Sequence, residues 1–262
     1  MDIIRIDCRQ IPGDDIAKSE PMRLARDCFN KNGYAILDHV LDAAAVEALR
    51  LEFQERYDKY LQDREYEETI EVGKKRFLVP VEFSGGFGDP LVYGNPFVIA
   101  LVREVLDLDA VLDNFGAVVS LSGSEKQHNH RDATLLFDSG ISTILPAHAM
   151  TVVLPLIDMN EQHGTTAIWP GSHRWKAFQE GLPFLSPEIP AGSAFMWDYR
   201  LFHHGTPNVS AAHRPMLYGT YARSWYRDAS NFDKSTQRRL WLPDDFIAAV
   251  PKDRQRLFAR VQ

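Results

Sequence analysis

The stretch SAFMWDYRLFHHGTPNVSAAHRPMLYGTYARSWY, residues 193–226, decides the fold. Two apolar runs rich in strand-forming residues flank a loop that contains Gly, Pro, Asn and three His. Two earlier runs, AVVSL at 117–121 and MTVVLPLI at 150–157, have the same texture, and no helical pattern separates the runs. Short strands divided by turn-rich loops are typical of an antiparallel sandwich or barrel. The sequence therefore predicts a β core over about residues 108–226.

Upstream of this core the pattern changes from strands to helices. Apolar residues recur at steps of three and four over 42–61, which predicts the clearest helix. Shorter helices are expected over 22–32, which a glycine ends, and over 96–106, which begins with proline. Residues 34–40 are expected to form the first strand. A helical N-terminal third packed on a β core makes the expected fold class α+β.

The chain is expected to form a single domain over residues 1–262. It contains no internal repeat, low-complexity tract or Gly/Ser linker. Residues 1–20 are polar and broken by Pro12-Gly13, so we expect them to form a loosely packed arm. Residues 227–262 then form a C-terminal extension.

Composition narrows the class of protein and its partners. The 262 residues carry 29 Lys plus Arg against 36 Asp plus Glu, a formal charge of −7, which argues against a nucleic-acid partner. No apolar run reaches the roughly 18 residues that a membrane span needs. The only cysteines, Cys8 and Cys28, do not form a secreted disulfide framework, and the N-terminus lacks the features of a signal peptide. We therefore expect a cytoplasmic protein with no membrane partner.

Histidines dominate the chemistry of the second half of the chain. The segment QHNHRD, residues 127–132, places His130 two residues before Asp132. Residues two apart in an extended strand face the same side, so an imidazole and a carboxylate can converge on one metal ion. On its own this pattern is weak, since a solvated polar loop has the same letters.

A second histidine cluster, His203-His204-Gly205, follows the apolar run that ends near residue 199. One imidazole from this cluster would complete a site of two His and one carboxylate. Such a facial triad leaves coordination positions open, as a non-heme Fe(II) oxygenase requires. Hydrolytic zinc sites use the same ligands, although the chain has no His-Glu-x-x-His helix.

Arg214 favours the iron alternative. It lies 11 residues after His203 and opens an apolar strand, where an unpaired guanidinium is costly to bury. A planar guanidinium facing into a barrel is suited to bind a carboxylate with two hydrogen bonds. A carboxylate clamp beside a metal site indicates a keto-acid co-substrate such as 2-oxoglutarate. The alternative is a structural arginine paired with a nearby acid.

With these residues in place, the chain resembles the phytanoyl-CoA dioxygenase family of Fe(II)/2-oxoglutarate oxygenases over roughly residues 22–226. The most specific motif is WPGSHR, whose expected role is structural, so His173 is not counted as a ligand. The resemblance rests on four blocks in order, QHNHRD at 127–132, AHAMTVVLPLIDM at 147–159, GTTAIWPGSHR at 164–174, and residues 198–215. It implies a double-stranded β-helix core, a cupin-like jelly roll, with flanking N-terminal helices.

The resemblance also implies roles for individual residues. His130, Asp132 and His203 match the iron ligands, and Arg214 matches the arginine that binds the distal carboxylate of 2-oxoglutarate. Many relatives read His-x-Gly-x-x-Asn at the second histidine, which selects His203 over His204, and the 11-residue step to Arg214 agrees.

Three further positions resemble co-substrate contacts less strongly. Gln127 and Thr166 match positions that contact 2-oxoglutarate in some relatives, and Arg76 lies near a basic residue that does likewise. Each also has a simpler interpretation, in which Gln127 braces its loop, Thr166 satisfies a turn and Arg76 is a surface charge.

The implied activity is a hydroxylation or related oxidation of a small organic substrate that consumes O₂ and 2-oxoglutarate and releases succinate and CO₂. Asp132 is intact, whereas related halogenases carry a small residue there, so oxidation is favoured over halogenation. Two other classes stay open. One is a non-catalytic jelly-roll binding protein, and the other is a zinc-dependent hydrolase that uses the same two-His-one-Asp site.

Substrate and oligomeric state are left open. The acidic charge gives no sign of a basic entrance for an acyl-CoA, so a small molecule of specialised metabolism is preferred. Loops carry specificity, and the Gly-rich loop over 80–95 is a candidate lid, with a plain surface connection as the alternative. Aromatic residues that could line a pocket, although such residues are more often core, are Phe83, Phe87, Phe137, Trp197 and Trp225.

Overall fold

The apolar runs form the centre of one large sheet in the computed structural model, which describes residues 3–63, 69–229, 231 and 238–261. Its eight strands lie in the order β1-β2-β8-β6-β10-β5-β4-β3, antiparallel except for the β1–β2 pair. The remaining two strands, β7 and β9, pair as a small second sheet. The strands are β1 Ile6–Asp7, β2 Tyr34–Asp38, β3 Ile70–Gly73, β4 Arg76–Pro80, β5 Val111–Ser120, β6 Ala149–Pro155, β7 Thr166–Ile168, β8 Ala194–Asp198, β9 His203–Gly205 and β10 Arg214–Ala222.

The expected helices are present and begin and end close to the expected residues. The helices are α1 Glu20–Asn32, α2 Ala43–Asp63, α3 Pro90–Tyr93, α4 Pro96–Leu106 and α5 Phe246–Ala249. The Asp42 side chain accepts a hydrogen bond from the Ala45 N–H (2.8 Å), and that of Asn95 accepts one from the Phe97 N–H (3.1 Å), so each caps the helix that follows.

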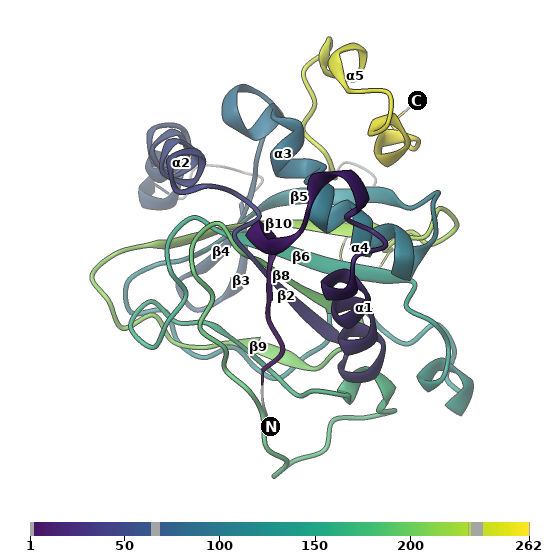
Figure 1. Cartoon of the computed structure of the whole chain (residues 1–262). Coiled ribbons are helices and arrows are strands. Elements are labelled where there is room, and N and C mark those ends of the chain that lie inside the picture. The colour runs from purple at the N-terminus through teal and green to yellow at the C-terminus, as the bar shows by residue number, and fades with distance from the viewer. Residues whose placement is uncertain (1–2, 64–68, 230, 232–237, 262) are drawn as a thin grey trace.

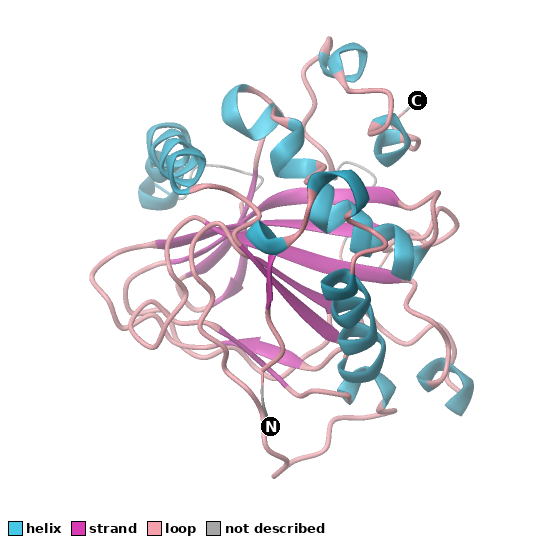
Figure 2. Cartoon of the chain, viewed as in Figure 1, coloured by secondary structure: helices cyan, strands magenta, loops and turns pink. Residues whose placement is uncertain are grey.

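Alternation along the central strands divides the large sheet into an outer and an inner face. On β6, Val152 and Leu154 face outward into the main hydrophobic core, which also contains Leu101 of α4 and Leu217 of β10. Helices α1, α3 and α4 lie against this side of the sheet, and the small sheet with its long loops lies on the other (Figures 1 and 2). The fold is therefore α+β, a cupin-like jelly roll whose inner face is left to line a cavity.

The N-terminal segment is packed more closely than expected. Strand β1 pairs with β2, so Tyr34–Asp38 is the second strand and not the first. Ile6, Cys8 and Ile11 are buried in the main core. Apolar side chains in these polar surroundings anchor the arm to the sheet edge.

The 80–95 loop is not a lid over the cavity. Phe83 and Phe87 are buried in the main core, where Phe83 contacts Phe246 and Phe258 of the C-terminal extension. No residue of this loop is among those that line the cavity. Burial of these aromatic side chains fixes the loop against the helical side of the molecule.

Gly33 joins α1 to β2 at a close approach. It ends α1 with a left-handed backbone (φ 82°), and a Cβ there would lie 2.6 Å from Nδ1 of the buried His173. The Gly171 N–H also donates to the Asn32 carbonyl (2.7 Å). The WPGSHR segment thus packs against the end of α1, as its expected structural role requires.

Across the described residues, no helix has the length and apolar character needed to cross a membrane.

Candidate metal centre and its cavity

The inner face of the large sheet and the small sheet together line a cavity of about 650 Å³. Its walls come from β3, β4, β5, β6, β8 and β10 of the large sheet, from β7 and β9, and from the loop that contains residues 127–132. All seven residues proposed from the sequence as ligands or co-substrate contacts are among its lining residues. They are Arg76, Gln127, His130, Asp132, Thr166, His203 and Arg214.

His130 and His203 are held opposite one another by their own backbones. The His130 N–H donates to the His203 carbonyl (3.0 Å), and the His203 N–H donates to the His130 carbonyl (2.8 Å). In each ring Nδ1 lies within hydrogen-bond distance of a carbonyl oxygen, His128 O at 2.8 Å for His130 and Leu201 O at 2.9 Å for His203. A carbonyl only accepts, so Nδ1 carries a proton in each ring and Nε2 is the nitrogen left to bind a metal ion.

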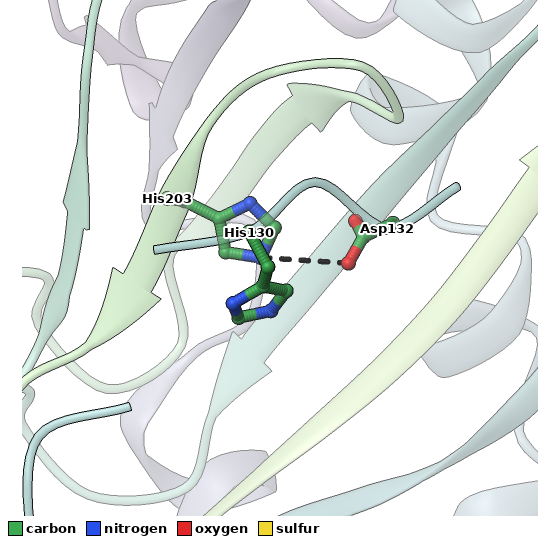
Figure 3. Close-up of side chains that lie close together, drawn as sticks. All are labelled: His130, Asp132 and His203. Atoms are coloured by element: carbon green, nitrogen blue, oxygen red, sulfur yellow. Dashed lines mark ion pairs between the residues drawn. The ribbon is translucent and has the colours of Figure 1, made fainter. Parts of the chain in front are cut away.

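Asp132 completes a cluster of three possible metal ligands. One possible ligand atom from each of His130, Asp132 and His203 lies within 4.8 Å of the others. Figure 3 shows the three side chains converging, with the carboxylate Oδ1 of Asp132 3.4 Å from Nε2 of His203. Two nitrogens and one carboxylate at this spacing can hold one divalent cation.

Two groups of the cluster are in the protonation state that binds a cation. Burial, together with the neighbouring His203, lowers the pKa of His130 to about 4, so this ring is neutral at pH 7. Burial alone would raise the pKa of Asp132, but His203, His130 and a hydrogen bond from Thr151 outweigh it and lower the pKa to about 2. Asp132 is therefore an anion, and metal ligands bind in this deprotonated form. Burial alone would lower the pKa of the third, His203, but Asp132 and the Leu201 carbonyl outweigh it and raise the pKa, so a cation competes with a proton for its Nε2.

His204 faces the opposite side of β9. Its ring contacts Trp169 (centroids 5.4 Å apart) and Phe184 (5.9 Å), and it is not among the cavity-lining residues. Successive side chains of a strand point to opposite faces, so only one histidine of the pair can reach the cavity.

Two buried guanidinium groups lie at one end of the cavity. Ser120 Oγ accepts from Nη2 of Arg214 (2.7 Å) and also from Nη1 of Arg76. Arg214 further donates to the Gly164 carbonyl (3.2 Å), and Arg76 to the Thr206 carbonyl (2.9 Å). Among the described residues, neither forms an ion pair with a carboxylate, and Nε of each has no hydrogen-bond partner. Burial lowers the pKa of Arg214 to about 9, with Arg76 adding to the effect, and lowers that of Arg76 to about 10.

Gln127 and Thr166 also belong to the cavity wall. Gln127 donates from Nε2 to the Val72 carbonyl (2.7 Å) and accepts at Oε1 from the Gly205 N–H (2.9 Å), so it does brace its loop. Thr166 is buried in β7 opposite Gly205. Arg76 is 1% exposed, so it is not a surface charge.

Sequence reasoning missed two polar residues of the inner face, Ser120 and Thr151, and proposed Trp197 as a pocket residue without its contact with Asp132. Ser120 joins the two arginines, while Thr151 and Trp197 both donate hydrogen bonds to Asp132. A polar residue at an alternating position inside an otherwise apolar strand is a signal for Ser120 and Thr151. Of the five aromatic residues proposed for a pocket only Trp197 lines the cavity, because Phe83 and Phe87 are core and Phe137 and Trp225 are exposed.

Sequence comparisons identify relatives of this chain. The profile of the family described as phytanoyl-CoA dioxygenase matches residues 29–216. A curated protein of Aspergillus fumigatus, Dioxygenase af480, is 26% identical over 171 residues, which cover 63% of this chain and 53% of that protein. The chain thus spans about half the length of this relative.

Solved structures of similar fold include SnoN and HygX. SnoN, described as a non-heme alpha ketoglutarate dependent epimerase from nogalamycin biosynthesis, has a TM-score of 0.60 at 18% identity and covers 84% of this chain and 91% of its own. HygX from Streptomyces hygroscopicus, solved with nickel, 2-oxoglutarate and hygromycin B bound, has a TM-score of 0.63 at 16% identity. That match covers 83% of this chain and 94% of HygX. At these identities the likeness concerns the fold.

Proposed function

The chain belongs to the phytanoyl-CoA dioxygenase family, and from this premise we propose that it is an Fe(II)- and 2-oxoglutarate-dependent oxygenase that hydroxylates a small organic molecule. One observation carries the proposal. A two-His-one-Asp cluster and a pair of buried arginines without carboxylate partners among the described residues line the same cavity. The first fits a metal ion, and the second fits the carboxylate of a keto acid.

His130, Asp132 and His203 are the proposed iron ligands. Their Nε2 and carboxylate atoms fit a divalent metal, because the Nδ1 hydrogen bonds already orient both rings. Three protein ligands leave positions open for a bidentate keto acid and O₂. The intact Asp132 favours hydroxylation over halogenation, since it occupies the position that a halide would need.

Arg214 is the proposed partner of the distal carboxylate of 2-oxoglutarate, with Arg76 adding charge beside it. A carboxylate at this end of the cavity would neutralise a buried cation that now has only neutral partners. Gln127 and Thr166 are proposed to contact the co-substrate from the adjoining wall, since both line the cavity.

When bound, iron and 2-oxoglutarate supply the oxidising chemistry, in which O₂ is consumed, 2-oxoglutarate becomes succinate and CO₂, and the substrate is oxidised. The chain itself binds, orients and excludes water. Apolar side chains of the inner face (Leu78, Val118, Val153 and Met216) line the cavity beside the polar groups. A volume of about 650 Å³ lies in the usual range for a site that encloses a small molecule.

Succinate release tests this function and separates it from its rivals. Purified protein with Fe(II), ascorbate, O₂ and 2-oxoglutarate is screened against small-molecule libraries, with succinate and a product mass increase of one oxygen as readouts. We expect succinate only with Fe(II), and not with Zn(II) or with Asp132→Ala. Metal-independent binding without succinate would indicate a binding protein, and product formation with Zn(II) alone would indicate a hydrolase.

The single-domain organisation, the cytoplasmic location and the absence of nucleic-acid and membrane partners stay predictions. The main hydrophobic core draws side chains from Ile6 to Phe258, which supports one folding unit.

A further inference from the structure

Two side chains that are far apart in sequence meet beside Asp132 through strand register. Thr151 of β6 and Trp197 of β8 are register partners on the inner face of the large sheet. Thr151 Oγ1 donates to Oδ2 of Asp132 (2.6 Å), and Trp197 Nε1 donates to the same oxygen (2.8 Å). One oxygen of the proposed ligand is therefore fully engaged by protein donors.

These two hydrogen bonds fix the rotation of the carboxylate. The terminal torsion of an aspartate is otherwise broad and nearly two-fold, so either oxygen could face the histidines. With Oδ2 bound to Thr151 and Trp197, Oδ1 is the oxygen that lies 3.4 Å from Nε2 of His203. The Trp197 ring also packs against the His203 ring, with centroids 5.1 Å apart, so one tryptophan orients two of the three possible ligands.

The backbone of Asp132 is anchored separately. Its N–H donates to the Tyr199 carbonyl (3.1 Å), and its carbonyl accepts from the Asn231 side chain (2.7 Å). Main-chain position and carboxylate rotation are thus set by different groups, and a change at Thr151 or Trp197 alters the rotation alone.

We propose that Thr151 and Trp197 are positioning residues that select Oδ1 of Asp132 as the metal-binding oxygen and keep the carboxylate to coordination through one oxygen. This inference rests on the proposed function. A carboxylate free to rotate can bind a metal through both oxygens and take a second coordination position. Keeping Oδ2 occupied leaves that position for the keto acid or O₂.

The test measures Co(II) binding to the apo protein, since Co(II) is stable in air and its visible absorption weakens as the coordination number rises. Hydrogen-bond partners of metal ligands typically account for a 10–100-fold change in metal affinity. We expect Thr151→Val and Trp197→Phe each to weaken Co(II) binding roughly 10–100-fold and to lower the intensity of the visible bands. Thr151→Ser, which keeps the hydroxyl, is expected to restore both.

Matched controls remove a threonine hydroxyl and an indole N–H elsewhere. Thr143→Val loses a hydrogen bond to the Gly140 carbonyl, and Trp169→Phe loses one to the Leu182 carbonyl, neither of which touches the cluster. Both are expected to bind Co(II) like the wild type. Thermal melting of each variant reports the fold, and because two variants act on the same oxygen independently, failure of one to fold leaves the other to decide.

The outcomes separate this inference from the function on which it rests. Wild-type Co(II) affinity and spectrum in both Thr151→Val and Trp197→Phe would overturn the positioning role while leaving the ligand set intact. A Thr151→Ser protein as impaired as Thr151→Val would also overturn it. A wild-type protein that does not bind Co(II), or that binds it equally well as Asp132→Ala, would overturn the proposed ligand set and this inference with it.

Discussion

His203 and His204 are neighbours in the chain but lie on opposite faces of β9. We expect His203→Ala to weaken metal binding at least roughly 100-fold, because it removes one of the three proposed ligands. His204→Phe is expected to retain metal binding within about threefold, since an aromatic ring suits the contacts with Trp169 and Phe184 and burial already keeps His204 neutral by lowering its pKa to about 4. Isothermal titration with Ni(II) measures both, and loss of binding in His204→Phe alone would refute the assignment.

For Arg214, we expect a substitution to weaken 2-oxoglutarate binding without lowering the free energy of unfolding. Truncating one partner of a buried hydrogen-bonded charge pair typically costs about 2–5 kcal/mol of binding free energy, so Arg214→Met should raise the Kd for 2-oxoglutarate at least roughly 30-fold. The free energy of unfolding of the ligand-free variant should be equal or higher, because the wild type buries a cation without a carboxylate partner among the described residues.

Two measurements check the Arg214 prediction. Tryptophan fluorescence of the Ni(II)-loaded protein gives the Kd for 2-oxoglutarate, and urea unfolding of the ligand-free protein gives stability. Arg50→Met, on the surface of α2, is the control and should leave the Kd unchanged. A destabilised Arg214→Met protein with normal 2-oxoglutarate affinity would show that this arginine is structural.

At this scale the sequence revealed the ligands better than their supports. His130 and Asp132 are two residues apart, and the motif around His203 resembles that of the family, so spacing together with the resemblance was enough to propose them. Ser120, Thr151 and Trp197 act only through contacts between strands that are distant in the chain. Register between such strands is set by packing, which no local pattern in one sequence reports.

At the scale of elements, the two helix caps differ in the number of hydrogen bonds that their side chains form. Asn95 is 1% exposed and, besides capping α4, donates from Nδ2 to the Val40 carbonyl (2.8 Å). Asp42 caps α2 from an exposed position. We expect Asp42→Ala to cost about 1 kcal/mol and Asn95→Ala about 2–3 kcal/mol, because the latter also leaves a buried carbonyl without its donor. Urea unfolding of both variants measures the difference, and equal losses would contradict it.

Element prediction succeeded where the periodic segments were long. The helices α1, α2 and α4 and the long strands β5, β6 and β10 carry enough residues for a period of 3.6 or 2 to be visible. The strands β1, β7 and β9 have two or three residues each, too few for any period. The β3–β4 hairpin was missed for two reasons. Strand β3 is largely exposed, so it has no apolar pattern, and the turn contains Lys74 and Lys75, which in the sequence look like a basic stretch of surface.

At the scale of the whole molecule, the composition argued against a nucleic-acid partner but could not show where in the fold the charged residues lie. A net charge of −7 coexists with a cavity end that holds two buried arginines. Net charge averages over the surface, whereas the site depends on which few charges the fold places inside. The polar residues of the N-terminal arm likewise concealed Ile6 and Ile11, which the fold buries in the main core.

Buried neutral histidine makes the fold acid-sensitive, and His148 shows this outside the metal cluster. It is 1% exposed and packs against Tyr226, with ring centroids 4.4 Å apart. Neither ring nitrogen has a hydrogen-bond partner within the described part of the chain. Burial lowers its pKa to about 4, from 6.5 for an exposed histidine.

The sign of the resulting pH dependence follows from proton binding. Between pH 6.5 and 4 the unfolded chain binds a proton at His148 and the folded chain does not, so stability falls as the pH falls through this window. The loss from this one group amounts to about 2 kcal/mol at pH 5 and nearly vanishes at pH 7.5. Urea unfolding at both pH values, with EDTA present to exclude metal, measures it. His148→Phe should lose about 2 kcal/mol less than the wild type between pH 7.5 and pH 5. Parallel profiles for wild type and His148→Phe would show that His148 accepts a proton in the folded protein.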